Sequence, residues 1–432
     1  MWLLRSMMKV KERIFWMKAI SLMNMMSMKK NFQMWMMNFQ MRMMKEALME
    51  KKMLLMIQYT YLRVIQIFVP LLLGELYTAA CSPTDPTLVA TGGGDEKGFL
   101  WKINQGDWIF ALEGHQDSVS CLAFSVDGKL LASGGLDGVV KIWDTASGDL
   151  RCTLEGPTGN IEWVRWHPKG HLILAGSDDS SVWMWNADKA AVLNVFTGHG
   201  SSVTCGDFTP DGKVICSGSD DATMRVWNPR TGEIIHVVRG HPYHTEGLTC
   251  LTINSDSTLV LTGSNDGSVH IVNISTGKVV SSLSAHSESV ECAAFELRCD
   301  LLLFHLHPVK SKETDTDTYI LLNTRGGYPM AATGGMDNKL IIWDLQHSSP
   351  RCTCDHEDGV TCLLWLSGSR FMATGCVDGK VRIWDSLSGN CARILCGHTG
   401  PIQSIDTSSN GEFLVAVSID GTARVFEIAE FR

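Results

Sequence analysis

The sequence predicts an all-β protein, an eight-bladed β-propeller, and three observations lead to this fold. First, the stretch from Gly114 to Asp144 contains three short apolar runs, SVSCLAF, KLLASGG and VVKIW, separated by Asp-Gly turns. Apolar and β-branched runs bounded by Gly and Asp are typical of strands joined by tight hairpins. Second, this stretch returns with variations to the end of the chain. Third, the returns are about 42 residues apart, which is the length of one four-stranded propeller blade.

The repeat period is measured from an aspartate in the second turn of each unit. Eight such aspartates are present, at Asp95, Asp137, Asp179, Asp221, Asp266, Asp337, Asp378 and Asp420. Their spacings are 42, 42, 42, 45, 71, 41 and 42 residues. Six residues after the aspartate, six of the eight units have a tryptophan, and 22 residues before it five have a histidine, which follows a glycine in three of them. A period near 42 with Gly-His and Trp-Asp ends is the signature of WD repeats.

The repeated polar residues are expected to have a structural task. In WD repeats these positions form an internal chain of hydrogen bonds. The aspartate accepts hydrogen bonds from its own turn and from the histidine, and the chain passes from the histidine to a hydroxyl group and the tryptophan indole. A buried polar network is favourable only when every member is paired. Four complete sets are predicted: His115, Ser133, Asp137 and Trp143; His199, Ser217, Asp221 and Trp227; His286, Thr333, Asp337 and Trp343; His356, Thr374, Asp378 and Trp384.

No residue is predicted to be catalytic, to bind a cofactor or to bind a metal, so we expect no enzyme. A catalytic triad is recognised by its geometry, and here the same His/Ser/Asp trio recurs as scaffold. The run TGGGDEKG is a hairpin rather than a phosphate loop, because neither a GxxxxGK[ST] pattern nor a following helix is present. Most of the 14 cysteines are single apolar positions in strands, which is typical of reduced core cysteines in an intracellular protein. Only Cys352 and Cys354 lie close together, without a second pair at zinc spacing.

The strands can be placed in order along residues 76–428. Blade 1 is expected to contain strands at Tyr77–Ala80, Leu88–Gly92, Gly98–Ile103 and Trp108–Leu112. Blade 3 replaces Gly-His with Gly-Pro, at Pro157, and blade 5 follows the ordinary pattern except for Val272 in place of tryptophan.

Two parts of the ring depart from the regular repeat. Blade 6 carries an insertion at residues 296–330, whose polar centre, KSKETDTDT, is expected to be a solvated loop. The chain ends soon after the third strand of blade 8, so that blade needs an outer strand from elsewhere. Residues 61–75, with the apolar stretch Leu62–Val69, are the only segment available as a ring-closing strand. A ring left open would expose an edge strand.

The N-terminal segment, residues 1–60, differs from the rest of the chain in composition. Residues 1–75 hold 17 of the 22 methionines and 12 Lys/Arg against 4 Asp/Glu. Because these runs have neither helical nor strand periodicity, we expect the segment to be disordered, or to be an acidic leader translated in the wrong frame. GA-initial Asp and Glu codons read one base later give Met, Lys and Asn, and the true frame would resume near Gly74. The basic start also resembles an organelle transit peptide, and the apolar part is too short to span a bilayer.

The charge of the remaining chain restricts the kind of partner. Residues 76–432 contain 25 basic and 42 acidic residues, a net charge of −17. Such a charge repels nucleic-acid phosphates, so no direct binding of nucleic acid is expected. An acidic ring would instead attract a basic protein.

Several stretches resemble one family more closely than WD repeats in general. EWVRWHP (162–168), LAGSDDSSVWMW (174–185) and GLTCLTINSDSTLVLTGSNDG (247–267) are similar to the angio-associated migratory cell protein family. That family resembles fungal chaperones, acidic eight-bladed propellers that capture a basic large-subunit ribosomal protein before assembly. The resemblance implies an escort of this kind in ribosome biogenesis. The alternative is a signalling or trafficking adaptor that binds partner peptides on the propeller face. We expect a monomer in the cytoplasm, with the nucleus as a second location.

Overall fold

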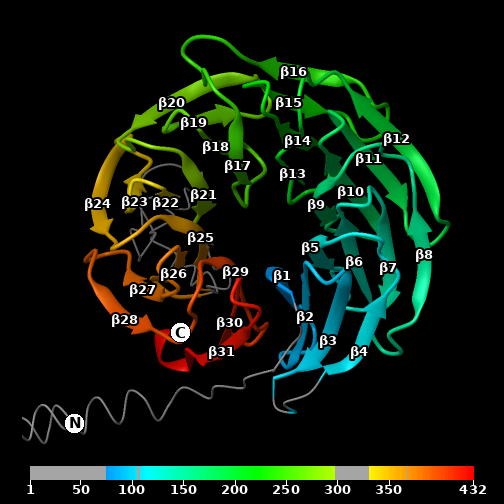
Figure 1. Ribbon diagram of the computed structural model, residues 1–432. Helices are drawn as coiled ribbons and strands as arrows, with labels where there is room; N and C mark the ends of the chain where they lie inside the picture. The colour runs from blue at the N-terminus through cyan, green and yellow to red at the C-terminus, as the bar shows by residue number, and fades with distance from the viewer. Residues whose placement is uncertain (1–73, 104, 106–107, 297–329, 367) are drawn as a thin grey trace, which may run out of the picture. The chain divides into compact units, whose positions relative to one another are not determined.

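The computed structural model describes residues 74–103, 105, 108–296, 330–366 and 368–432. All of them lie in the second of two compact units, Ile65–Arg432. Within that described part, 31 strands form eight antiparallel sheets, which follow one another around a ring (Figure 1). The predicted fold, an all-β protein with an eight-bladed WD-repeat propeller, is confirmed.

In each blade the strands are hydrogen-bonded in chain order, and we name them a to d from the centre of the ring outward. Blades 1 to 4 consist of β1 (Leu76–Cys81), β2 (Leu88–Gly93), β3 (Lys97–Lys102) and β4 (Trp108–Glu113); β5 (Val119–Phe124), β6 (Leu130–Gly135), β7 (Val140–Asp144) and β8 (Leu150–Leu154); β9 (Ile161–Trp166), β10 (Leu172–Ser177), β11 (Ser181–Asn186) and β12 (Ala191–Thr197); β13 (Cys205–Phe208), β14 (Ile215–Gly218), β15 (Met224–Trp227) and β16 (Ile234–Val238).

Blades 5 to 8 follow the same order. They consist of β17 (Leu248–Ile253), β18 (Leu259–Ser264), β19 (Ser268–Asn273) and β20 (Lys278–Ser284); β21 (Val290–Phe295), β22 (Met330–Gly335), β23 (Lys339–Asp344) and β24 (Ser349–Asp355); β25 (Val360–Trp365), β26 (Phe371–Cys376), β27 (Val381–Asp385) and β28 (Cys391–Leu395); β29 (Ile402–Thr407), β30 (Phe413–Ser418) and β31 (Ala423–Glu427). A 3₁₀ turn, Ala429–Phe431, follows β31.

Blade 8 has three strands among the described residues, with β31 at its outer edge. The predicted ring-closing strand lies outside the described residues up to residue 73, as do residues 1–60 and positions 297–329 of the insertion. Side chains of the first and last blades nevertheless pack together, because Val89 and Trp101 share one buried cluster with Val415 and Val425. Burial of such apolar side chains stabilises a fold by roughly 1.5–3 kcal/mol each.

Neighbouring blades are joined at the inner strands by a repeated pairing of cysteine and glycine. The third residue of strand a is a cysteine that packs on a glycine of strand b, as Cys121 does on Gly134. A Cβ at Gly134 would lie 2.6 Å from the Cys121 Sγ and equally close to Ile161 of the next blade. The same arrangement is present at Cys205, Cys250, Cys292 and Cys362. These cysteines are free thiols inside the packing between blades.

Blade 3 has a larger residue at the position of this cysteine. Trp163 takes the cysteine position, and its indole donates a hydrogen bond to the Val203 carbonyl of blade 4 at 2.9 Å. The indole ring of Trp163 fits because the residue beside it in blade 4 is Gly206. A Cβ at Gly206 would collide with the indole. Trp163 and Gly206 are therefore a matched large and small pair across the blade boundary.

Candidate binding face

The antiparallel blades present two faces that differ in their turns. We call the face of the b–c turns and d–a loops the upper face, and the face of the a–b and c–d turns the lower face. On the upper face, the residue before each turn aspartate donates its N–H to a carbonyl just before strand a, as Asp220 does to Ser202 at 3.0 Å. Two sets of side chains therefore surround the upper mouth of the ring.

These two sets, the upper mouth residues, are acidic or uncharged. The first set contains the second residue of each inner strand or, in blade 4, the residue just before β13: Tyr77, Ser120, Glu162, Thr204, Thr249, Glu291, Thr361 and Gln403. The residues before the turn aspartates are Gly94, Leu136, Asp178, Asp220, Asn265, Met336, Val377 and Ile419. Four of these positions carry a carboxylate and none carries Lys or Arg. The upper mouth is thus a place of uncompensated negative charge.

Three of the carboxylates, Glu162, Asp178 and Asp220, gather on blades 3 and 4, and we call them the acidic trio. All three residues are exposed. Partial desolvation, together with the charges of Asp178 and Asp220, raises the pKa of Glu162. Desolvation and the charge of Asp221 raise the pKa of Asp220. Carboxylates that repel one another in this way gain stability when a cation comes near them.

The loops beside the trio approach it closely because they contain glycine. A Cβ at Gly247 would lie 2.6 Å from the Asp220 Oδ1, and a Cβ at Gly159 would overlap the Asp178 carboxylate. Two cations at the start of third strands of the upper face lie farther out and already have partners. Lys97 binds Glu113 with 2.6 Å between Nζ and Oε1, and Lys380 binds Glu357.

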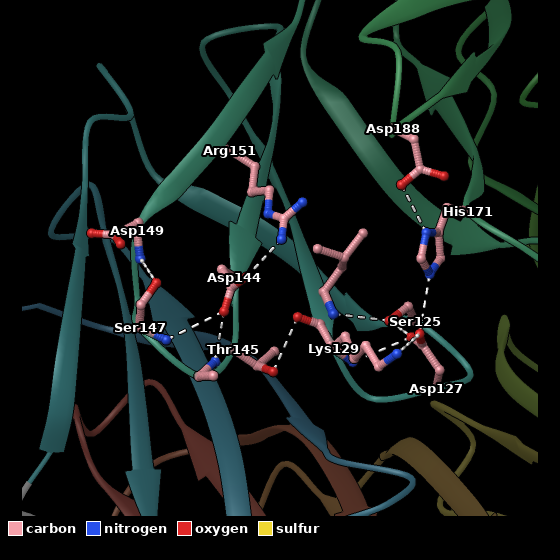
Figure 2. Close-up of polar contacts among 12 residues, drawn as sticks. Ser125, Asp127, Lys129, Asp144, Thr145, Ser147, Asp149, Arg151, His171 and Asp188 are labelled. Atoms are coloured by element: carbon pink, nitrogen blue, oxygen red, sulfur yellow. Dashed lines mark hydrogen bonds and ion pairs between the residues drawn. The ribbon is translucent and has the colours of Figure 1, made fainter.

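The lower face has the opposite character, since several of its carboxylates are paired. Figure 2 shows the His171 ring between Asp127 of blade 2 and Asp188 of blade 3, and Arg151 directed at Asp144. The hydrogen bond from Ser125 lowers the pKa of Asp127 to about 2. The hydrogen bond from Lys213 does the same for Asp211 in blade 4. Each of these carboxylates supports a turn rather than an open site.

The structure brings the predicted hydrogen-bond sets together in blades 2, 4 and 6. In blade 2 the His115 ring binds Asp137 through Nδ1 at 3.0 Å and Ser133 through Nε2 at 2.7 Å, and the Trp143 indole donates to Ser133 at 2.8 Å. The corresponding distances are 3.2, 2.8 and 2.8 Å for His199, Ser217, Asp221 and Trp227. They are 2.9, 2.8 and 2.8 Å for His286, Thr333, Asp337 and Trp343.

Blade 7 differs from the prediction. His356 binds Thr374 through Nε2 at 2.9 Å, and Trp384 donates to Thr374 at 3.1 Å, but the histidine Nδ1 lies 3.1 Å from the Cys354 carbonyl instead of the aspartate. The reason is Arg382, whose guanidinium donates to both carboxylate oxygens of Asp378 at 3.2 and 2.6 Å. A bidentate arginine is a stronger partner for a carboxylate than an imidazole, so it displaces the histidine.

Two blades replace the set with other residues, which the sequence analysis did not predict. In blade 5, where Val272 stands for tryptophan, the Tyr243 hydroxyl donates to Thr262 at 3.1 Å and His244 binds the same threonine at 2.8 Å. In blade 3, Pro157 and Ala175 remove the histidine and the hydroxyl together, and Trp183 stacks on Trp185 with 5.9 Å between ring centroids. The signal in the sequence was the simultaneous loss of several repeat positions in one blade.

The buried histidines are suited to structure rather than to acid–base chemistry. Burial lowers the pKa of His199 and of His356 to about 4, and it lowers the pKa of His115 as well. A neutral ring can donate from Nδ1 to the aspartate and accept at Nε2 from a hydroxyl, which in turn accepts from the indole. Within the described ranges no group of three or more His, Cys, Asp or Glu could hold a metal ion. The same residues include no helix that is long and apolar enough to cross a membrane.

Comparison with solved structures shows the same fold. Sqt1 of Chaetomium thermophilum, solved bound to the N-terminus of the ribosomal protein L10, superposes with a TM-score of 0.70 at 21% identity, covering 82% of this chain and 97% of Sqt1. Sqt1 of Saccharomyces cerevisiae gives a TM-score of 0.69 at 19% identity, covering 82% and 96%. The computationally designed protein Ika8 gives 0.67 at 22% identity, with the same coverage.

Comparison of sequences gives a narrower match. The angio-associated migratory cell proteins of Homo sapiens and Canis lupus familiaris are 33% identical over 117 residues. The match covers 27% of this chain and 27% of the length of those relatives. The WD domain, G-beta repeat family matches residues 106–144, 148–186, 191–228, 232–273, 348–385 and 389–427. These segments make up more than half of the sequence, and the chain belongs to the WD40 repeat family.

Proposed function

We propose that this chain is a non-enzymatic binding platform that captures a basic protein segment on its upper face. The observation that carries the proposal is the acidic trio, Glu162, Asp178 and Asp220, with the raised pKa values of Glu162 and Asp220 and no cation among the upper mouth residues. A Lys/Arg-rich segment placed there relieves the repulsion between the carboxylates and adds charge-assisted hydrogen bonds. The net charge of −17 in residues 76–432 steers such a partner toward the ring.

The partner most consistent with this chemistry is a basic large-subunit ribosomal protein, which the chain would escort in the cytoplasm before assembly. Support comes from the similarity of the fold to Sqt1, which is a protein solved with the N-terminus of ribosomal protein L10. Support also comes from the partial similarity to the angio-associated migratory cell proteins. Capture on the upper face would shield the basic segment until it is handed over. The chain is proposed to act as a monomer, without a cofactor.

The second function proposed is that of a signalling or trafficking adaptor. Uncharged upper mouth residues on other blades, such as Met336, Val377 and Ile419, favour it, because they offer an apolar surface to a peptide without basic residues. The two functions differ in the partner and in the response to salt. An escort of a basic segment depends on electrostatic attraction, which salt screens, whereas apolar contacts do not weaken with salt.

Affinity capture with the tagged chain, followed by mass spectrometry, distinguishes the two functions. The escort function predicts recovery of one basic large-subunit ribosomal protein in near-equal amount at low salt and its loss at high salt. Recovery of membrane or receptor proteins that resist high salt would favour the adaptor. The matched control is a chain with Glu162→Gln, Asp178→Asn and Asp220→Asn, which should lose the ribosomal protein and keep any partner held by apolar contacts.

A further inference from the structure

Two thiols lie side by side on the outer strand of blade 6. Cys352 and Cys354 are two residues apart in β24, so their side chains leave the strand on the same side. The two thiols interact, because each of them shifts the pKa of the other. Cys354 is buried, and Cys352 is half-buried and accessible to solvent. The pair therefore combines one thiol that a reagent can reach with one that it cannot.

A turn of the next blade holds this pair in place. The Cys354 thiol donates to the Gly389 carbonyl of blade 7 at 3.5 Å between Sγ and oxygen. A Cβ at Gly389 would lie 3.2 Å from the Cys352 Sγ and 3.9 Å from the Cys354 Sγ, so both sulfur atoms lie under the same turn. Because Gly389 also has a φ of +71°, a larger residue is disfavoured there twice. The contact fixes the two sulfur atoms relative to each other.

The pair differs electrostatically from the other cysteines that the structure describes. The hydrogen bond from the Cys354 thiol, with help from the Arg351 charge, lowers the pKa of Cys352 to about 7. The same hydrogen bond raises the pKa of Cys354. Desolvation raises the pKa of Cys121, Cys205, Cys250 and Cys362 to between about 11 and 12. A thiolate rather than a thiol is the nucleophile, so Cys352 should react first.

We propose that Cys352 and Cys354 form a peroxide-sensitive dithiol, in which Cys352 is oxidised and Cys354 then closes a disulfide. In the first step the Cys352 thiolate attacks hydrogen peroxide, which forms a sulfenic acid and releases hydroxide. In the second step the Cys354 sulfur attacks the Cys352 sulfur, and the sulfenic oxygen leaves as water with the Cys354 proton. Hydrogen peroxide accepts the two electrons that the thiols lose, and one S–S bond then joins the two protein sulfur atoms.

The geometry makes this disulfide easy to reduce. Residues two apart in a strand have Cα atoms about 6.6 Å apart. That separation lies close to the upper limit of about 6.8 Å for a disulfide, and the two Cβ atoms must also come within about 4.5 Å of each other, so the strand has to bend at Thr353 when the bond forms. A strained and solvent-accessible disulfide has a high reduction potential, which is typical of reversible rather than structural bonds. Its formation also draws the Cys354 sulfur away from the Gly389 carbonyl, so oxidation should loosen the contact between the outer strands of blades 6 and 7.

Peptide mapping of the full chain tests this proposal directly. Trypsin releases the segment from Cys352 to Arg370, which contains Cys352, Cys354 and the buried Cys362. After mild hydrogen peroxide and then alkylation, this peptide should carry one alkyl group, on Cys362, and lack two hydrogens. Glutathione should restore three alkylated thiols. Before oxidation, Cys352 should be alkylated at pH 7 at least about tenfold faster than the exposed Cys391, because its thiolate fraction is larger.

Two variants keep the test independent of folding. Cys354→Ser should leave a Cys352 sulfenic acid that a dimedone probe traps, whereas Cys391→Ser, on the neighbouring β28, should behave as the unaltered chain does. The proposal would be overturned if Cys352 passed to sulfonic acid without forming the internal disulfide. It would also be overturned if Cys391 reacted first, or if the disulfide resisted glutathione.

Discussion

The upper and lower faces of blades 2 to 4 use the same residue type in opposite ways. On the lower face the carboxylates of Asp127, Asp144 and Asp211 each have a hydrogen-bonded partner, and their pKa values are lowered. On the upper face Glu162 and Asp220 face other carboxylates, and their pKa values are raised. Aspartate is abundant on both faces, so composition alone does not separate them.

The difference indicates which charges hold the ring and which are available to a partner. The charge of a paired carboxylate is already stabilised by its partner, so this carboxylate stabilises a turn and attracts a further cation only weakly. A carboxylate near others of its kind destabilises the free protein slightly and gains when a basic segment arrives. Binding sites often keep such unfavourable arrangements for this reason.

The largest effect is expected from breaking the hydrogen-bond chain that supports the upper face of blade 4. Ser217→Ala leaves the Trp227 indole without an acceptor and the His199 Nε2 without a donor, both in a buried site. Two unpaired buried groups should lower the free energy of unfolding by about 2–4 kcal/mol. Ser147→Ala, in an exposed turn of the lower face, should change it by less than about 0.5 kcal/mol. Denaturant unfolding of both variants checks this, and equal effects would contradict the structural role of the chain.

A second prediction concerns the pH dependence of binding. Since the pKa values of Glu162 and Asp220 are raised, these carboxylates take up protons at a higher pH than ordinary carboxyl groups when the pH falls. Affinity for a Lys/Arg-rich peptide should therefore weaken as the pH falls toward 5, while the lower-face carboxylates are still ionised. Binding should also release protons, which calorimetry in buffers of different ionisation enthalpy detects. An affinity that is constant between pH 7 and 5 would exclude the trio as the site.

The smallest effect is expected from the His171 bridge on the lower face. The hydrogen bond to Asp188, and a second to Asp127, raise the pKa of His171, although burial opposes the shift. The bridge therefore stabilises the fold fully below the unfolded pKa of about 6.5. The contribution is lost as the pH rises through the raised folded value. His171→Gln should cost about 0.5–1 kcal/mol at pH 6 and less at pH 9, with binding unchanged. A loss of stability that grows with pH would show that the His171 imidazole does not act as a cation.

The fold followed from the sequence because its signal is repeated. Spacing alone located the turn aspartate and tryptophan of each blade, and the strands of blade 1 lie within one or two residues of the predicted ranges. The prediction for blade 7 was wrong because spacing identifies the residues at the repeat positions but not which donor binds the aspartate. Arg382, four residues after Asp378, is closer to it in structure than the predicted histidine is.

The binding face could be predicted only in part. The charge of −17 indicated a basic partner, but it did not show that several lower-face acids are paired and that those of the trio are not. That distinction depends on interactions between residues of different blades that are far apart in the sequence, such as His171 with Asp127 and Glu162 with Asp220. Similarly, the tyrosine that replaces an indole in blade 5 occupies a glycine slot, where the repeat pattern predicts no side chain at all.

The central claim is tested most directly by titrating three forms of the full chain with one fluorescent Lys/Arg-rich peptide at low salt. The first is the unaltered chain, the second has Glu162→Gln, Asp178→Asn and Asp220→Asn, and the third has Asp149→Asn, Glu233→Gln and Asp256→Asn in exposed lower-face turns. The second and third carry the same net charge. We predict at least about tenfold weaker binding for the upper-face variant and nearly unchanged binding for the lower-face variant. Equal weakening in both would mean that net charge, and not the acidic trio, attracts the partner.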